Sequence, residues 1–354
     1  MEAKRVVITG VGPVSAVGIG REAFFDALKQ GRSGIGPITA FPTDGLTSKL
    51  AGEVRGFDVR DYLETEKTYL DRASQFAFAA MSLAIEDANL DLKKLDRASF
   101  GLVLGSAMGC LGSAQLFFND YLEKGPRFVK PILFPHTYAN TSISLLAIEY
   151  GLEGYHLDFA SGGTSSASAI LQSYDLIRTG RSPLVFTGGT EALSPLLFRG
   201  YELSGWLSPD RGCVLGEGAG ILVLEEADHA RRRGAHIHGE ILGGGMTGDS
   251  IARAMRLASQ HLPQGPDSVG RISAAACGDS DLDQIETDAI REFLGACADT
   301  VPVGRIKALL GETLGADAAL RSIAALDALE TDAVLVNSID RGGNGVCLAM
   351  GKAC

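Results

Sequence analysis

The sequence predicts an α/β fold in which helices cover both faces of a sheet. Short apolar runs that end in glycine alternate with amphipathic helical segments along most of the chain, and this alternation is typical of sheets with helical connections. Glycine makes up 45 of the 354 residues, about twice the usual share, and it follows no collagen-like period. The length allows about two domains of ordinary size, or one large duplicated body.

The first series of elements begins near the N-terminus. The β-branched run Val6–Thr9 predicts a buried strand, and the glycines at 10, 12 and 18 predict a tight loop after it. Helices are expected at 22–31 and 71–88, followed by a strand at 100–104. A strand that ends near Ala160, a helix from Ser165 or Ser166 and a strand that ends at Glu191 continue the alternation.

A second series begins near Gly239. It contains a strand at that glycine, helices at 283–295 and 318–329, and a strand from Ala333. No Pro/Ser-rich linker divides the two series, so we expect them to pack as one body.

Charge and cysteine usage exclude several classes of function. The formal net charge of −11 argues against nucleic acid or an anionic membrane as a partner, because binding phosphates needs a basic face. The six cysteines show no CxxC spacing, so neither a zinc site nor a disulfide framework is indicated, and a reducing cytoplasm is the expected location. The start of the chain lacks the apolar core of a signal peptide, and the later apolar runs are too short to span a bilayer.

Two patterns that could bind a cofactor or a metal are weak. The segment TGVGPVSAVGIG follows a strand, but its glycines do not give GxGxxG, so a tight strand-to-helix turn is the favoured interpretation. His236 and His238 alternate along a predicted strand and would share a face, yet no third ligand accompanies them, so two polar side chains exposed to solvent are the favoured interpretation. The sequence therefore predicts no cofactor and no metal.

A stronger signal for chemistry lies at 157–169, LDFASGGTSSASA. A strand is expected to end near Ala160, small residues make the turn, and a helix begins near Ser165. Free backbone N–H groups at such a helix start suit an oxyanion or a nucleophile. The segment is not GxSxG and no histidine follows in a recognisable setting, so a serine hydrolase is not indicated.

Five segments occur in order along nearly the whole chain: VVITGVGPVSAVG at 6–18, PRFVKPILFPHTYAN at 126–140, GLEGYHLDFASGGTSSASA at 151–169, FTGGTEA at 186–192 and GCVLGEGAGILVLEEADHARRRGA at 212–235. Together they resemble β-ketoacyl-(acyl carrier protein) synthases of the elongating type. The resemblance implies a duplicated thiolase-type fold, layered α-β-α-β-α and usually dimeric. It would place an N-terminal thiolase-like half with loop insertions at 1–235 and a C-terminal half at 236–354, packed as one body.

In that family a cysteine at the first turn of a helix takes the acyl chain, and two histidines serve decarboxylation and condensation. This chain departs from the pattern at all three positions. The nucleophile position falls on Gly163, the first histidine position on Cys277 and the second on Glu312, while Lys307 of the second motif is retained. Glycine cannot form a thioester, and neither cysteine nor glutamate supplies the neutral imidazole hydrogen bonds that stabilise a thioester enolate. Condensation by this chain alone is therefore predicted to be absent.

Two further regions depart from the family. The gate segment 337–343, NSIDRGG, lacks the expected phenylalanines. The stretch 64–71, ETEKTYLD, is mostly acidic or neutral where synthases carry basic residues for an acidic carrier protein. Arg127 and Lys130 remain, so docking to the carrier is expected to be weakened.

A synthase-like chain without its nucleophile resembles a chain-length factor, the non-condensing subunit that pairs with an intact synthase in polyketide, polyene or fatty-acid-type biosynthesis. We expect a heterodimer with that synthase, and contact with acyl carrier protein mainly through it. Chain-length factors commonly carry glutamine where Gly163 stands, so the match to that subfamily is incomplete. Five residues are expected to shape the acyl tunnel: Met108, Cys110, Leu111, Leu133 and Phe134.

Two other interpretations stay open. The chain could be an acyl-thioester enzyme that uses Cys277 as nucleophile and Glu312 as acid or base, or a homodimeric acyl-binding protein. Cys277 could equally be a small buried thiol, and Glu312 could be a structural partner of Lys307.

Overall fold

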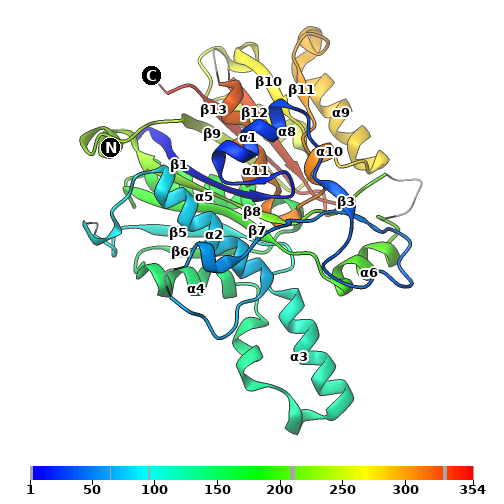
Figure 1. The fold of residues 1–354 in the computed structure, drawn as a ribbon. Coiled ribbons are helices and arrows are strands. Elements are labelled where there is room, and N and C mark those ends of the chain that lie inside the picture. The colour runs from blue at the N-terminus through cyan, green and yellow to red at the C-terminus, as the bar shows by residue number, and fades with distance from the viewer. Residues whose placement is uncertain (1–2, 64, 95, 208–211, 330–332, 354) are drawn as a thin grey trace.

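The computed structural model describes residues 3–63, 65–94, 96–207, 212–329 and 333–353. An eleven-stranded mixed sheet forms its centre, in the order β11-β10-β12-β13-β9-β1-β8-β7-β5-β6, with β2 paired to β1 (Figure 1). Its strands are β1 (Val6–Ser15), β2 (Gly18–Ile19), β5 (Gly101–Gly105), β6 (His156–Phe159), β7 (Leu184–Glu191), β8 (Gly218–Glu226), β9 (Gly239–Thr247), β10 (Val269–Ser273), β11 (Val303–Gly304), β12 (Ala333–Ile339) and β13 (Gly345–Gly351). A separate hairpin pairs β3 (Ile35–Pro37) with β4 (Leu50–Gly52).

The sheet consists of two halves with the same topology. In the first half β5 pairs in parallel with β6 and β7, and β8 pairs antiparallel with β7 and β1. In the second half β10 pairs in parallel with β11 and β12, and β13 pairs antiparallel with β12 and β9. Antiparallel pairing of β1 with β9 joins the halves. The predicted duplication is confirmed.

Helices separate and cover the two half-sheets. Helices α5 (Ser165–Arg178) and α11 (Asp317–Ala325) contact strands of both halves, α2 (Arg72–Asp87) and α4 (Thr141–Tyr150) cover the outer face of the first, and α8 (Ile251–Ser259) with α9 (Ser280–Leu294) covers that of the second. This arrangement gives the predicted α-β-α-β-α layers. The remaining helices are α1 (Arg21–Lys29), α3 (Leu111–Lys124), α6 (Pro195–Leu203), α7 (Ala227–Arg232) and α10 (Lys307–Leu310).

The glycines near the N-terminus correct one prediction. The tight turn does not begin after Thr9, because β1 continues through Gly10 and Gly12 to Ser15 and the turn follows at 16–17. A methyl group on Gly10 would lie 2.5 Å from the carbonyl oxygen of Ala84, and one on Gly12 would lie 1.9 Å from that of Ala80. Both carbonyls belong to α2, so these glycines let that helix pack directly on the strand.

The histidine pair corrects a second prediction. Strand β9 begins at Gly239, so His236 and His238 precede the strand on which they were expected to alternate. The His238 side chain is also buried, with Nε2 2.8 Å from a carboxylate oxygen of Asp87, so it is not the solvent-exposed side chain that was expected. Among the described residues no group of three or more His, Cys, Asp or Glu side chains could hold a metal ion. No helix among the described residues is both long and apolar enough to cross a bilayer.

Candidate functional site

The turn before α5 is the strand-turn-helix unit that the sequence predicts at 157–169. Strand β6 ends at Phe159, a 3-10 turn covers Gly162–Thr164, and α5 starts at Ser165. The Ser165 hydroxyl accepts a hydrogen bond from the Ser161 N–H (2.9 Å) and donates one to the Gly162 carbonyl (2.7 Å), which fixes the turn. Gly162 has φ +58°, a left-handed conformation that favours glycine.

Gly163 has room for a Cβ atom. A Cβ atom there would have the Ile339 carbonyl oxygen as its nearest neighbour, at 3.4 Å, which is an ordinary van der Waals contact. The carbonyl of Gly163 accepts a hydrogen bond from the Ser338 hydroxyl at 2.9 Å. Position 163 therefore has room for a side chain but carries none.

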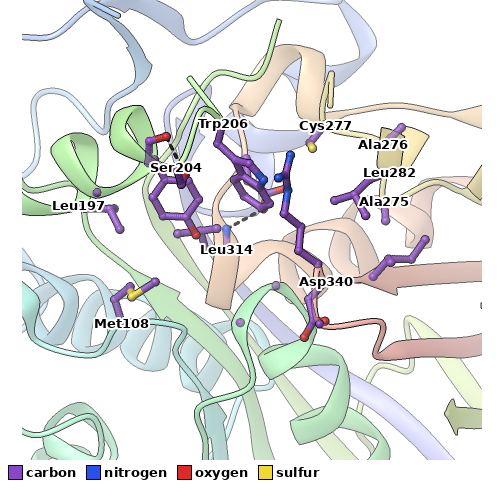
Figure 2. A pocket seen from close by; sticks show the side chains of 18 of the residues that line it. Met108, Leu197, Ser204, Trp206, Ala275, Ala276, Cys277, Leu282, Leu314 and Asp340 are labelled. Carbon is purple, nitrogen blue, oxygen red and sulfur yellow. Dashed lines mark hydrogen bonds between the residues drawn. The ribbon is translucent and has the colours of Figure 1, made fainter. Parts of the chain in front are cut away.

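Gly163, Cys277 and Glu312 line one cavity of about 610 Å³, although they come from distant parts of the chain. None of the described residues that line this cavity is a histidine. Figure 2 shows Met108 and Leu197 on one side of it, Cys277, Ala276 and Leu282 on another, and Trp206 and Leu314 between them. The wall is mainly apolar and includes Met108, Leu111, Leu196, Leu197, Ala275, Ala276, Leu282, Leu314 and Ile339.

The five residues expected to shape a tunnel fall into two groups. Met108 and Leu111 line the cavity. Cys110 does not: its thiol contacts the hydroxyls of Ser74 (3.5 Å) and Ser142 (3.9 Å), and burial raises its pKa to about 12. Leu133 is buried and Phe134 is half exposed, and both lie outside the cavity in the segment between α3 and α4.

A buried charge network lies behind Glu312. Lys307 Nζ is 2.6 Å from the Glu312 carboxylate and 3.2 Å from that of Asp317, and Arg321 pairs with Asp317 at 2.6 Å. All four side chains are at most 6% exposed. Burial alone would lower the pKa of Lys307, but the charges of Asp317 and Glu312 outweigh it and raise that pKa. Lys307 is therefore a fixed cation.

Glu312 is fully engaged within this network. Its Oε2 accepts from Lys307 and its Oε1 accepts from the backbone N–H of Leu314 at 2.8 Å. Its own backbone bonds to Val214 and Gly216 on a neighbouring segment. A carboxylate with both oxygens occupied is poorly placed to exchange protons with a ligand, which favours the structural role for Glu312.

Cys277 lies in a loop held by a carboxylate. The backbone N–H groups of Cys277 and Gly278 donate to Asp283 at 2.9 and 3.2 Å. The Cys277 side chain is partly exposed. The neighbouring Cys277 thiol and burial together raise the pKa of Cys213 far above its usual range.

Part of the cavity lining consists of aromatic and charged residues that sequence reasoning missed. The guanidinium of Arg341 stacks over the Trp206 ring at 4.6 Å and forms an ion pair with Asp279, and Tyr201 packs against Trp206 with ring centroids 4.8 Å apart. Arg341 belongs to the gate segment 337–343. A single tryptophan in the chain and a charged gate are sequence signals that could have suggested this pairing.

Basic residues for carrier docking are only partly in place. Arg127 and Lys130 are exposed between α3 and α4. Lys67 forms an ion pair with Glu149, and Glu64 lies outside the described residues.

Glu191, at the end of β7, binds the backbone of two segments that carry cavity-lining residues. It is fully buried, and one carboxylate oxygen accepts from the N–H groups of Ala107 (2.7 Å) and Gly315 (3.2 Å). The other oxygen has no hydrogen-bond partner among the residues that the structure describes. Burial outweighs these bonds and raises the Glu191 pKa to about 8, so the neutral acid is the form that fits the folded chain at neutral pH.

Glu191→Gln is expected to change the pH dependence of stability. Between about pH 4.5 and about 8, the folded chain keeps the Glu191 proton, which the unfolded chain releases. The contribution of this group to the free energy of unfolding is therefore fully present below about pH 4.5 and is lost as the pH rises to about 8. The variant should match the native chain near pH 4.5 and be more stable by about 2–4 kcal/mol at pH 8.5. Urea unfolding at both pH values measures this. Glu292→Gln, at an exposed position, should show no such change.

Comparison with known proteins places the chain in a family. "Beta-ketoacyl synthase, N-terminal domain" matches residues 3–230 and "Beta-ketoacyl synthase, C-terminal domain" matches residues 241–339. The chain belongs to the beta-ketoacyl synthase family. It is 32% identical to the 3-oxoacyl-[acyl-carrier-protein] synthase 2 of Synechocystis, over 94% of this chain and 87% of that protein.

Solved ketosynthase structures share the fold closely. One described as "The ishigamide ketosynthase/chain length factor" superposes with a TM-score of 0.89 at 30% identity, covering 99% of this chain and all of the other. A beta-ketoacyl synthase from Burkholderia phymatum superposes with a TM-score of 0.88 at 26% identity over the same shares. The fold is thus the thiolase type of the ketosynthases.

Proposed function

We propose that this ketosynthase-like chain is a non-condensing subunit of the chain-length-factor type. It pairs with an intact β-ketoacyl synthase and shapes the acyl tunnel in polyketide, polyene or fatty-acid-type biosynthesis. The observation that carries the proposal is the cavity in which Gly163, Cys277 and Glu312 meet, since the resemblance of the sequence motifs assigns the nucleophile and the two histidines to these positions. The fold and cavity are retained, but the groups that perform condensation are replaced.

The chemistry of the replacements supports the loss of condensation. Gly163 offers no atom to carry an acyl group. Glu312 is a carboxylate paired with Lys307, and an anion at this position would repel a developing enolate instead of stabilising it. The cavity wall is mainly apolar, which suits a hydrocarbon chain that is bound but not reacted.

An exposed apolar surface supports the need for a partner. Helix α3 and the residues that follow it to 140, the projecting segment, extend away from the body (Figure 1). Large apolar side chains on this segment and on the adjoining α4 are exposed to solvent: Leu116, Phe118, Tyr121, Leu122, Phe128, Ile132, Phe134, Tyr138 and Ile148. A concentration of this kind marks a protein interface, and we assign it to the synthase subunit. The exposed Arg127 and Lys130 lie on the same segment, where acyl carrier protein would meet both subunits.

Co-expression with an intact synthase tests the proposal. The chain and a synthase subunit from the same gene neighbourhood should co-purify as a heterodimer and form product only together. Cysteine-to-alanine substitution in the synthase should abolish product, whereas Gly163→Ala in this chain should preserve it. Condensation by this chain alone would contradict the proposal, and so would a homodimer that does not bind the synthase.

Leu122→Asp is expected to weaken the heterodimer at least about tenfold, because a charge would have to be buried in an apolar interface. Leu122 is 76% exposed on the projecting segment. Leu203, 75% exposed on α6, provides a matched control, and Leu203→Asp should leave the affinity unchanged. Analytical ultracentrifugation or surface plasmon resonance measures the dissociation constant. Equal effects of the two substitutions would remove the projecting segment from the interface.

Gly163→Cys is expected to yield a reactive thiol without restoring condensation. The site has room for a Cβ atom and lines the cavity, so the free energy of unfolding should stay within about 1 kcal/mol of the native value. A thiol at the start of α5 is activated by the helix N-terminus, and iodoacetamide labelling with peptide mapping should find it alkylated. Condensation should stay at background because no imidazole replaces Cys277 or Glu312. Substantial condensation by this single variant would contradict that reasoning.

The alternative of an acyl-thioester enzyme that uses Cys277 and Glu312 has less support, because both Glu312 oxygens already accept hydrogen bonds. Turnover of an acyl thioester by this chain alone that Cys277→Ala abolishes would favour that alternative. Bound lipid on a purified homodimer, detected by native mass spectrometry, would favour an acyl-binding protein.

A further inference from the structure

Two cysteines are neighbours at the cavity wall. Cys277 lines the cavity, and it raises the pKa of the nearby Cys213, whose side chain is only 5% exposed. Figure 2 shows the Cys277 sulfur at the edge of the cavity. The two residues lie on separate segments, 212–216 and 274–278, of which one precedes β8 and the other follows β10.

The backbones of these segments are also in close contact. A Cβ atom on Gly278 would lie 2.8 Å from the Gly212 carbonyl oxygen and 3.3 Å from the Cys213 nitrogen. The residues next to both cysteines are thus packed together, and a disulfide requires backbones this close. The remaining described cysteines differ: Cys110 and Cys347 are buried elsewhere, and Cys297 is exposed.

We propose that Cys213 and Cys277 form a reversible disulfide in the cavity wall when the protein meets a low-molecular-weight disulfide such as oxidised glutathione. The inference does not depend on the proposed function. The more accessible Cys277 thiolate attacks the small disulfide, which forms a mixed disulfide and releases one thiolate. Cys213 then loses its proton to solvent and attacks the Cys277 sulfur, and the second small thiol leaves. Two protein thiols are oxidised and one small disulfide is reduced to two thiols.

The order of attack follows from exposure. Cys277 reaches the cavity, whereas Cys213 is buried and its thiol is held in the protonated form by its neighbour and by burial. Cys213 therefore resolves the mixed disulfide instead of starting the reaction.

The bond would connect the segments that build the cavity. Residues 214–216 bind the backbone of Glu312. The Glu312 N–H donates to the Val214 carbonyl at 2.7 Å, and the Gly216 N–H donates to the Glu312 carbonyl at 2.8 Å. Oxidation would therefore tie the loop of Cys277 to the segment that positions Glu312, and would remove the free thiol from the cavity.

Trapping after oxidation tests the proposal. The full chain is incubated with glutathione buffers of increasing oxidised fraction, quenched with N-ethylmaleimide and examined by intact mass and peptide mapping. The native chain should lose two alkylatable thiols and yield a peptide that links Cys213 to Cys277, and excess reduced glutathione should reverse both changes. Failure to form this linked peptide, or a glutathione adduct that stays on Cys277 of the native chain, would overturn the proposal.

Three substitutions sharpen the test. Cys213→Ser should stop the reaction at a glutathione adduct on Cys277, and Cys277→Ser should prevent both adduct and crosslink. Cys297→Ser, at an exposed position away from the pair, should leave the crosslink unchanged. The result on the native chain needs no variant, so a variant that fails to fold does not decide the outcome. A Cys213–Cys277 crosslink that forms equally in urea would show that folding does not direct it, and would also overturn the proposal.

Discussion

Replacing Lys307 by methionine is expected to lower the free energy of unfolding by about 3–5 kcal/mol. The ammonium group lies 2.6 Å from Glu312 and 3.2 Å from Asp317, and its side chain is 5% exposed. Without it, Arg321 still pairs with Asp317, but Glu312 loses its only ion-pair partner among the described residues. An uncompensated buried charge is among the largest single losses that a folded chain can suffer.

Urea unfolding of two further variants tests whether this loss of stability comes from the buried network or follows the removal of any paired lysine. Lys94 forms an ion pair with Asp91 on the surface, at 3.0 Å with the lysine 81% exposed, so Lys94→Met should cost less than about 1 kcal/mol. The double variant Lys307→Met, Glu312→Leu leaves the Asp317–Arg321 pair balanced and should recover at least half of the loss. A double variant no more stable than Lys307→Met would contradict this account of the network.

Gly12→Ala is expected to destabilise the fold by at least about 3 kcal/mol. The added methyl group would lie 1.9 Å from the carbonyl oxygen of Ala80 and 2.8 Å from the nitrogen of Ala84. These are backbone atoms of α2 and cannot rotate away, so the helix would have to separate from β1 and lose contacts across that layer.

Gly200→Ala is the matched control for this substitution. Gly200 lies within α6, and a methyl group there would meet no atom within 4 Å. Alanine favours helix over glycine, so stability should rise by about 0.5–1 kcal/mol. Thermal or urea unfolding compares the two variants, and a similar loss in both would show that the contact between α2 and β1 is not the cause.

Local patterns explain why much of the fold could be predicted from the sequence. The helix expected at 71–88 is α2, with Asp71 accepting from the Ala73 N–H at its start, because apolar spacing and an N-cap residue are both visible in sequence. The turn at 162–164 was predictable from small residues between a strand and a helix. The positions of Gly163, Cys277 and Glu312 followed from ordered motifs that resemble one family.

Contacts between distant segments explain what was missed. Glycine at 10 and 12 suggests a turn, and only the approach of α2 shows that it permits close packing instead. The pairing of Trp206 with Arg341 and the contact of Cys213 with Cys277 join segments far apart in the chain, and no local pattern encodes such neighbours. Cys110, although next to a cavity residue in sequence, turns toward Ser74 and Ser142.

Acyl transfer within the purified heterodimer tests the central claim most directly. The complex of this chain with an intact synthase is incubated with a labelled acyl-(acyl carrier protein), and the subunits are then separated and digested. The account predicts a thioester on the synthase cysteine and none on this chain, with the same result after Cys277→Ala. A labelled acyl group bound covalently to this chain, at Cys277 or at any other residue, would contradict it.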